Sequence, residues 1–252
     1  MGQALATAWL AAMVVATLPV AYLVAMGLLA ATARSDPGRR LAHRFVAGWC
    51  SQYLRCWPGW SLTVRGGERL PPGPCVLVAN HQSMADILAL MALPGHFKFV
   101  SKASLFEVPA IGQMMRWLRY VPLERGKLRS AEAMLLACSG LLRAGERVLI
   151  FPEATYAEGG TRLPFRRGAF RLAQAEQVPL VLVSLHGTAE LVAGDGPWFS
   201  PRGAVAVEVR EVLPAPAPDA ELGPLVAAVE ARYHRWLEQP GPRREGVTED
   251  GP

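Results

Sequence analysis

The sequence has no C-x-x-C pair, no G-x-S-x-G pentapeptide and no dense lysine and arginine tract interleaved with aromatic residues. Without C-x-x-C spacing neither a zinc site nor a disulfide framework is indicated, and we predict reduced packing roles for Cys50, Cys56, Cys75 and Cys138. Without the pentapeptide a covalent acyl-enzyme has no obvious carrier. The missing basic tract argues against a nucleic-acid partner.

Charged side chains are also absent from Gly2 to Ala33, where Leu, Val, Ala and Met dominate. Because about 20 apolar residues span a bilayer, this stretch predicts a membrane helix. A secretory signal peptide would begin with basic residues, and Met1 to Leu10 has none, so we expect the helix to be retained. Four arginines follow at positions 34, 39, 40 and 44. The positive-inside rule therefore predicts that this flank and the domain after it face the cytoplasm, and the inner (cytoplasmic) membrane is the expected location.

The remaining composition indicates one α/β domain with an appendage. A chain of 252 residues is too short for two ordinary domains with linkers. It is 51% hydrophobic and carries a net charge of +5, a combination that favours a lipid bilayer as partner. We expect anchoring helices over 1–60, the main domain over 61–238 and a disordered polar tail over 239–252.

The segment from Leu41 to Trp60 mixes arginines with an aromatic series near helical spacing. Two interpretations stay open: a helix in the headgroup layer, or a core helix whose aromatic side chains pack against the domain. After it, apolar runs and helical patterns alternate, which predicts an α/β fold with a single mixed sheet flanked by helices. The predicted strands are 61–64, 75–79, 97–101, 147–151, 180–184 and 204–209, and the predicted helices are 83–91, 130–143, 168–176 and 220–237.

The stretch "LVANHQSMADILALM" places His81 directly after a buried strand and Asp86 one turn into the next helix. In α/β proteins ligands bind at the carboxyl ends of strands, so His81 is well placed for chemistry. Asp86 can accept a hydrogen bond from one imidazole nitrogen and leave the other to take a proton. The pair then serves as general base and orienter, with the substrate supplying the nucleophile. The competing interpretation is a structural pair that caps the helix.

A second strand end carries "FPEAT", which places Glu153 and Thr155 after the strand that ends at Phe151. Arg166 and Arg167 follow in "LPFRRGAF", just before Gly168 opens a helix. Two guanidinium groups at a helix N-terminus are a natural anion site, because backbone N–H groups and the helix dipole add to their charge. The alternative is a solvated basic loop.

Together these residues resemble the glycerolipid acyltransferase superfamily, and within it the 1-acyl-glycerol-3-phosphate (lysophosphatidate) acyltransferase family. The family's H-x4-D motif matches His81 and Asp86 with the preceding Asn80, and a second block matches "FVSKASLFEVPAIGQMMRWLRYVPLER" with Lys102, Gly112 and Arg125. "FPEAT" with its following Arg-Gly-Ala matches the third block in part, and "VPLVLVSLHGT" matches the fourth. The resemblance covers roughly Cys75 to Thr188.

The resemblance implies that 61–238 is an acyltransferase domain. It would transfer an acyl group from acyl-CoA or acyl carrier protein (acyl-ACP) to a membrane lipid acceptor, without metal or bound cofactor. His81 would deprotonate the acceptor hydroxyl and Asp86 would steady the resulting imidazolium. Asn80, Glu153, Thr155 and Gly168 would belong to the substrate-binding site, and the basic residues Lys102, Arg125, Arg166 and Arg167 would hold the acceptor's phosphate.

The third block departs from the family pattern, because Tyr156 stands where the family has an arginine. A tyrosine supplies neither the charge nor the bidentate fork of a guanidinium. Either another arginine (Arg125, Arg162, Arg166 or Arg167) replaces it, or the acceptor is a different lysolipid, such as a lyso-ornithine lipid.

Two further hypotheses about the activity stay open, a lipid-facing hydrolase and an inactive, membrane-anchored lipid-binding protein. A hydrolase would use the same His81–Asp86 pair to activate water, whereas the altered third block would suit a protein that has lost activity. We assign structural roles to His43, His96, His186 and His234, since none has a carboxylate partner in a comparable sequence setting.

Overall fold

A seven-stranded sheet forms the centre of the computed structural model, which describes residues 2–153, 163–193, 198–239 and 241. The strand order is β1-β9-β6-β2-β5-β3-β4. The strands are β1 (Trp60–Arg65), β2 (Val76–Ala79), β3 (Lys98–Lys102), β4 (Val121–Leu123), β5 (Val148–Ile150), β6 (Leu180–His186) and β9 (Gly203–Leu213). A second, two-stranded sheet pairs β7 (Val192–Ala193) with β8 (Trp198–Phe199).

The sheet is mixed in direction, which confirms the predicted fold class. Strands β6, β2, β5, β3 and β4 run parallel, β9 pairs antiparallel with β6, and β1 runs parallel to β9. The five parallel strands therefore end at one edge of the sheet, which we call the carboxyl edge, and begin at the opposite amino edge.

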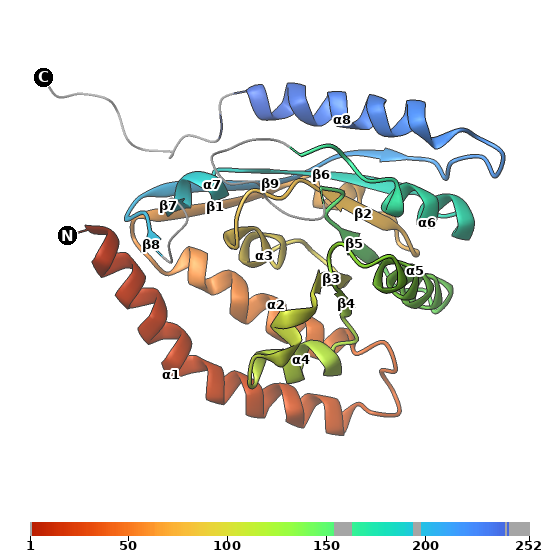
Figure 1. Cartoon of the computed structure of the whole chain (residues 1–252). Coiled ribbons are helices and arrows are strands. Elements are labelled where there is room, and N and C mark those ends of the chain that lie inside the picture. The colour runs from red at the N-terminus through yellow and green to blue at the C-terminus, as the bar shows by residue number, and fades with distance from the viewer. Residues whose placement is uncertain (1, 154–162, 194–197, 240, 242–252) are drawn as a thin grey trace, which may run out of the picture.

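Helices cover both faces of the sheet (Figure 1). One face carries α1 (Gly2–Ala31), α2 (Arg40–Arg55), α3 (Ala85–Leu90) and α4 (Ile111–Trp117), and the other carries α5 (Leu128–Arg143), α6 (Gly168–Glu176) and α8 (Leu222–Glu238). Short helices complete the chain at η1 (Gly67–Arg69), η2 (Ala103–Glu107) and α7 (Thr188–Leu191).

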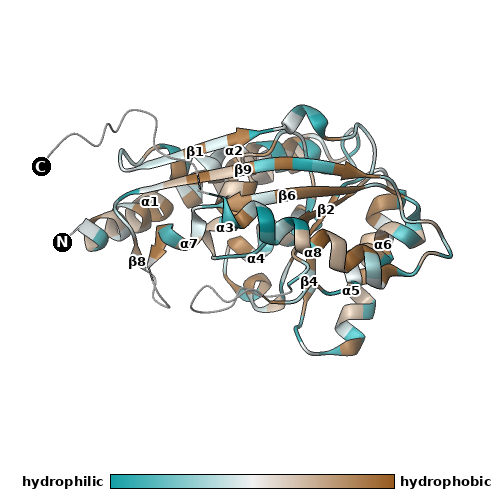
Figure 2. Cartoon of the chain, turned by 90° about the horizontal axis from the view of Figure 1, so that it is seen from above, coloured by the Kyte–Doolittle hydropathy of each residue, from teal (hydrophilic) through white to brown (hydrophobic). Residues whose placement is uncertain are grey.

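The central strands are apolar on both faces because both faces are covered. Leu77 and Ala79 pack toward the α1–α4 layer, whereas Val76 and Val78 pack toward α5, α6 and α8. Every residue of β6 is buried, and the strand is largely brown in Figure 2. Continuous apolar runs of this kind are expected for parallel strands between two helical layers.

The structure adds elements that the sequence pattern does not predict. The predicted strands and helices are all present with boundaries shifted by a few residues, and α6 has the predicted ends. Strand β4 is the outermost strand of the sheet. It is three residues long and contains Pro122, so it offers almost no periodicity to detect. Helices α4 and α7 are likewise too short for a clear 3.6-residue pattern.

Helix α1 is long and apolar enough to cross a membrane by length and composition. Small buried residues (Ala6, Ala21 and Ala25) face the domain, while large apolar side chains such as Leu5, Val15, Val20 and Leu23 are exposed. Contacts with the domain extend along the helix. The Phe199 N–H donates to Thr7 Oγ1 at 2.8 Å, and the Tyr22 ring lies 5.1 Å from the Trp117 ring.

Helix α2 lies between α1 and the sheet, and its aromatic side chains pack there. Its Tyr53 is buried, and Trp49 Nε1 donates to Thr17 Oγ1 of α1 at 3.0 Å. The Trp57 and Trp60 ring centroids lie 5.9 Å apart beneath α1. The aromatic series is therefore a packing surface, as the core-helix interpretation predicts. Cys56 is exposed, so a packing role is wrong for this one cysteine.

Candidate active site

His81 and Asp86 form a buried hydrogen-bonded pair at the carboxyl edge. β2 ends at Ala79, so His81 stands two positions after the last strand residue, and its Nδ1 lies 2.7 Å from Asp86 Oδ2. The side chains are 6% and 0% exposed. An ionised carboxylate only accepts hydrogen bonds, so Nδ1 carries the proton and Nε2 is the basic nitrogen.

The loop between β2 and α3 holds Asp86 in place. The same Oδ2 atom accepts the backbone N–H groups of Gln82 at 2.6 Å and Ser83 at 2.9 Å. These two bonds close the loop around the carboxylate and aim it at His81. Five residues from histidine to aspartate are the length that lets the first turn of α3 fold back on the strand end.

Glu153 and Phe151 reach His81 from the neighbouring strand. β5 runs parallel to β2 with Val78 opposite Ile150, so the residues that follow each strand meet at the same edge. Glu153 Oε2 accepts the backbone N–H of His81 at 3.3 Å, and the Phe151 ring stacks on the imidazole at 4.1 Å with planes 16° apart. The imidazole therefore has one orientation, fixed by a carboxylate at its edge and an aromatic ring at its face.

Asn80 supports the site through the backbone. Its amide donates to Leu185 O at 3.0 Å and accepts from Leu185 N at 2.8 Å, and the residue is buried. These two hydrogen bonds tie the end of β2 to β6. The geometry therefore gives Asn80 a positioning role beside the substrate-binding role expected from its motif.

Two basic residues extend the carboxyl edge beyond β5. Lys102 is the last residue of β3, and Arg125 follows the end of β4 by two residues. Because β3 lies next to β5 and β4 next to β3, His81, Glu153, Lys102 and Arg125 follow four adjacent strands in order. Both basic side chains are exposed. The predicted residues are thus gathered along one edge, with contacts joining His81, Asp86 and Glu153.

The Arg166–Gly168 segment returns to the same edge, since Arg166 N–H donates to Pro152 O at 2.8 Å. Both arginines are exposed, and α6 begins at Gly168, where an added Cβ would meet open space. An Arg167 Nη2 atom lies 3.5 Å from where a Cβ at Gly223 would stand, so this guanidinium reaches toward the start of α8. Arg166 is therefore the better candidate for an anion near His81. Thr155, Tyr156 and Arg162 lie outside the described residues.

Several groups that build the site could not be identified from the sequence pattern. The Gln82 and Ser83 N–H groups act through the backbone, and Thr188 closes the far side by donating to Gln82 Oε1 at 3.1 Å. Ser83 Oγ donates to Thr188 O at 2.9 Å, so this serine is not activated by His81. Burial raises the pKa of the Cys75 thiol to about 12, which keeps it protonated. Within the described ranges no cluster of three or more His, Cys, Asp or Glu side chains could hold a metal ion.

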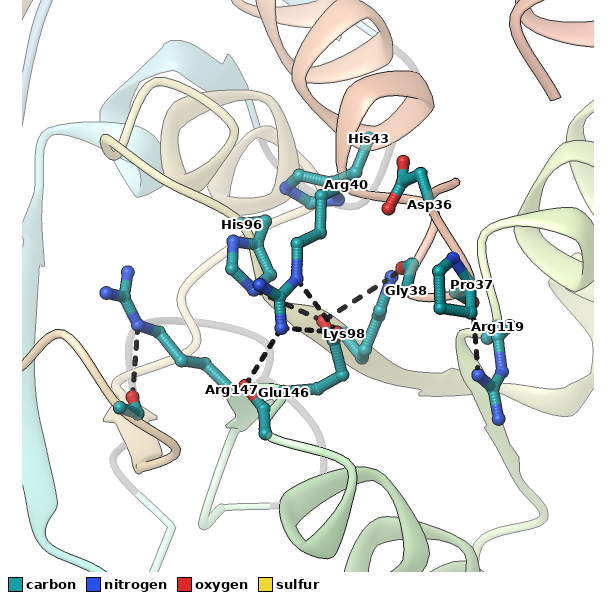
Figure 3. Close-up of polar contacts among 12 residues, drawn as sticks. Asp36, Pro37, Gly38, Arg40, His43, His96, Lys98, Arg119, Glu146 and Arg147 are labelled. Carbon is teal, nitrogen blue, oxygen red and sulfur yellow. Dashed lines mark hydrogen bonds and ion pairs between the residues drawn. The ribbon is translucent and has the colours of Figure 1, made fainter. Parts of the chain in front are cut away.

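One sequence argument about the other histidines is wrong. His96 does have a carboxylate partner: its Nε2 lies 3.2 Å from Glu146 Oε2. This contact belongs to a buried cluster at the amino edge (Figure 3), opposite the edge that carries His81. The long stretch of chain between the two residues hides the pairing from local sequence patterns, but a structural role for His96 fits its setting.

Comparison with known proteins shows which protein family the sequence matches. A family model described as Acyltransferase matches residues 61–186. The chain is 36% identical over 181 residues to a chloroplastic 1-acyl-sn-glycerol-3-phosphate acyltransferase of Brassica napus, covering 71% of this chain and 52% of that protein. It is 32% identical to the human 1-acyl-sn-glycerol-3-phosphate acyltransferase beta, covering 70% of this chain and 64% of that protein. The chain thus spans about half the length of the plant relative.

A solved structure shows the same fold over nearly the whole chain. The crystal structure of PlsC, the 1-acyl-sn-glycerophosphate acyltransferase from Thermotoga maritima, matches with a TM-score of 0.75 and 22% identity. The match covers 94% of this chain and 95% of that one, so it includes the N-terminal helices as well as the sheet.

Proposed function

This chain belongs to the acyltransferase family, and from that premise we propose that it transfers a fatty acyl group from acyl-CoA or acyl-ACP to the free hydroxyl of 1-acyl-glycerol-3-phosphate, giving phosphatidate. The observation that carries the proposal is the buried His81–Asp86 pair, with Nδ1 and Oδ2 2.7 Å apart at the edge where substrates enter α/β folds. The names of the relatives support the acceptor.

In the proposed reaction His81 is the general base. Nε2 takes the proton of the acceptor hydroxyl as its oxygen attacks the thioester carbonyl, and the collapse of the tetrahedral intermediate expels the thiolate, which the imidazolium reprotonates. Asp86 stabilises the imidazolium and holds its tautomer. General-base help of this kind contributes about 10² to 10⁴ in rate, and positioning of two bound substrates supplies much of the rest. We propose that this reaction uses no resident metal or cofactor.

The exposed cations along the carboxyl edge bind the acceptor phosphate in this proposal. Lys102 and Arg125 approach from β3 and β4, and Arg166 approaches from the loop before α6, where its backbone is fixed to Pro152. Guanidinium groups pair with phosphate oxygens in a bidentate fork, which compensates for Tyr156. Glu153 and Thr155 shape the pocket around the hydroxyl.

We further propose that the protein is attached to the inner membrane with the sheet on its cytoplasmic side. Support comes from the apolar face of α1 and the arginines that follow it. Residues 61–238 form the acyltransferase domain and 1–60 anchor it, with α2 packed into its core. The expected disorder of the 239–252 tail falls almost entirely outside the described residues.

A thiol-release assay tests the reaction. The detergent-solubilised protein is given palmitoyl-CoA with lysophosphatidate, with a lyso-ornithine lipid or with no acceptor. We expect CoA release only with lysophosphatidate, together with formation of phosphatidate. Release without an acceptor would instead identify a hydrolase, and no release with palmitoyl-CoA or palmitoyl-ACP would favour an inactive lipid-binding protein.

The second candidate acceptor rests on Tyr156 alone. Since this residue replaces the arginine that the family has in its third block, a lysolipid without a phosphate monoester would lose little by the change. Use of the lyso-ornithine lipid in place of lysophosphatidate would establish that acceptor.

A further inference from the structure

A pocket of about 560 Å³ lies where the end of α1 meets α4, away from the candidate active site. Its apolar wall comes from α1 and α4, and its polar wall comes from three arginines: it is lined by Met26, Leu29, Ala30, Pro37, Arg39, Arg116, Trp117 and Arg119. Arg119 stands just before β4 begins, so the pocket lies toward the amino edge, whereas His81 lies at the carboxyl edge.

The three arginines have no carboxylate within 4.0 Å in the part of the chain that the structure describes. Arg39 Nη1 contacts Leu29 O at 3.5 Å and Arg119 Nη1 contacts Pro37 O at 3.3 Å, so their donors are only partly used. The nearby Asp36 is engaged elsewhere, because its Oδ2 accepts Leu41 N–H at 2.8 Å. The pocket therefore concentrates positive charge that the described protein groups leave without a paired anion.

The backbone holds two of these arginines in an unfavourable conformation. Arg39 has φ 58° and Arg119 has φ 60°, in the left-handed region that costs residues other than glycine about 1 kcal/mol or more. Both strained residues line the same pocket. Such strain persists only where surrounding contacts enforce it, and it concentrates at binding sites.

At Arg39 the contacts that enforce it belong to the buried cluster at the amino edge (Figure 3). At Arg119 the left-handed residue closes the C-terminus of α4, where Tyr120 N–H donates to Met115 O at 3.0 Å. Lys98 Nζ donates to Gly38 O at 2.5 Å, and Arg40 pairs with Glu146 at 3.0 Å. Lys98 is 0% exposed and Glu146 is 1% exposed. The connector between α1 and α2 is thereby fixed to the sheet, so the Arg39 side of the pocket is built in advance of any ligand.

We propose that this pocket binds the headgroup phosphate of an anionic phospholipid of the surrounding membrane. The phosphate lies against the guanidinium groups, which match it in charge and geometry. The acyl chain follows the exposed apolar face of α1, where Met26 and Leu23 lie three residues apart. Trp117, which lines the pocket beside Tyr22, is of the residue type enriched at membrane interfaces. A bilayer lipid is the favoured occupant because the charged wall and the membrane-compatible helix meet at this pocket. The proposal does not depend on the acyl-transfer reaction.

Native mass spectrometry of the detergent-solubilised full chain tests this site, with phosphatidylglycerol and phosphatidylcholine as probes. A surface arginine contributes about fivefold to the binding of anionic lipid. We expect Arg116→Gln to weaken phosphatidylglycerol binding about fivefold and Arg116→Gln/Arg119→Gln more, with phosphatidylcholine binding unchanged.

The single variant tests the site even if the double variant folds poorly. Arg116 is exposed, and among the described residues its guanidinium makes no hydrogen bond or ion pair that the change to glutamine would remove. The matched control, Arg171→Gln/Arg235→Gln, removes two exposed arginines on α6 and α8.

Three results would overturn the proposal. The first is an Arg116→Gln variant that binds phosphatidylglycerol as tightly as the wild type or the control. The second is a loss that follows Arg166→Gln, which would place the lipid in the catalytic site. The third is displacement of the lipid by equimolar glycerol 3-phosphate, which would identify a site for free phosphate. Turnover in the thiol-release assay is expected to be unchanged by Arg116→Gln, so this proposal and the acyl-transfer proposal can fail separately.

Discussion

Strand β5 has a buried glutamate near each end, and the two glutamates lie in opposite surroundings. Glu153, at the carboxyl edge, is 8% exposed and accepts the backbone N–H of His81, with the exposed cations Arg125 and Arg166 in the same region. Glu146, at the amino edge, is 1% exposed and lies against Arg40, His96 and Lys98. The same residue type thus lies beside exposed cations at one end of β5 and in a cluster whose charges pair within the protein at the other.

Titration behaviour follows from the buried surroundings of the amino edge. Burial lowers the pKa of Lys98 to about 8, and burial with the Lys98 charge lowers the pKa of His43 to about 3. Burial alone would raise the pKa of Glu146, but the hydrogen bond from His96 and the charge of Lys98 outweigh it and bring the pKa below its ordinary value. We therefore expect these groups to contribute to stability and those at the carboxyl edge to contribute to the rate.

The largest expected effect is on the rate, through Asp86→Asn. An amide keeps the shape but removes the charge that stabilises the imidazolium, so we expect turnover to fall by about 10² to 10⁴. The matched control is Asp36→Asn at the amino edge, whose carboxylate accepts a helix N–H from Leu41. Steady-state thiol release should separate the two, and equal rates in both variants would remove the distinction between the edges.

The next effect is on stability, through Glu146→Ala. Removing one partner of a buried ion cluster leaves Lys98 without its counter-charge, so that it stays uncompensated or gives up its proton, and this costs up to about 3–5 kcal/mol of unfolding free energy. Urea unfolding followed by circular dichroism measures it, and turnover per folded molecule should be retained. Glu153→Gln should do the reverse, with a lower rate and a smaller loss of stability. If Glu146→Ala instead lowers turnover at unchanged stability, the amino edge takes part in catalysis.

The effect that is smallest at neutral pH is the acid sensitivity contributed by His43. Its pKa of about 3 in the folded protein lies below the ordinary 6.5, so the unfolded chain binds more protons between these values. Stability from this group is present above pH 6.5 and is lost as the pH falls toward 3. His43→Gln should therefore show a flatter decline in unfolding free energy over that window. If unfolding free energy declined with pH equally in the wild type and the variant, the lowered pKa of His43 would be contradicted.

The carboxyl edge could be predicted from the sequence, because its residues follow strands directly. His81, Glu153 and Lys102 each stand at or just beyond a strand end, and parallel pairing brings such positions together. Local sequence motifs were therefore enough to predict which residues meet at this edge. The Tyr156 substitution could also be seen, although its structural consequence falls outside the described residues.

The amino edge could not be predicted, because its contacts join distant segments. Arg40 meets Glu146 across more than a hundred residues, and Gly38 meets Lys98 across sixty. The packing role of α2 was equally hidden, since an aromatic helical face has the same pattern whether it meets lipid or another helix. Only the position of α1 over that face decides between them.

The most direct test of the division between the edges compares His81→Ala with His96→Ala, because each removes a histidine that contacts a buried carboxylate. Turnover per folded molecule and unfolding free energy would be measured for both. We predict that His81→Ala loses at least about 10² in rate with little change in stability, and that His96→Ala loses stability but keeps its rate. An unchanged rate in His81→Ala would contradict the account.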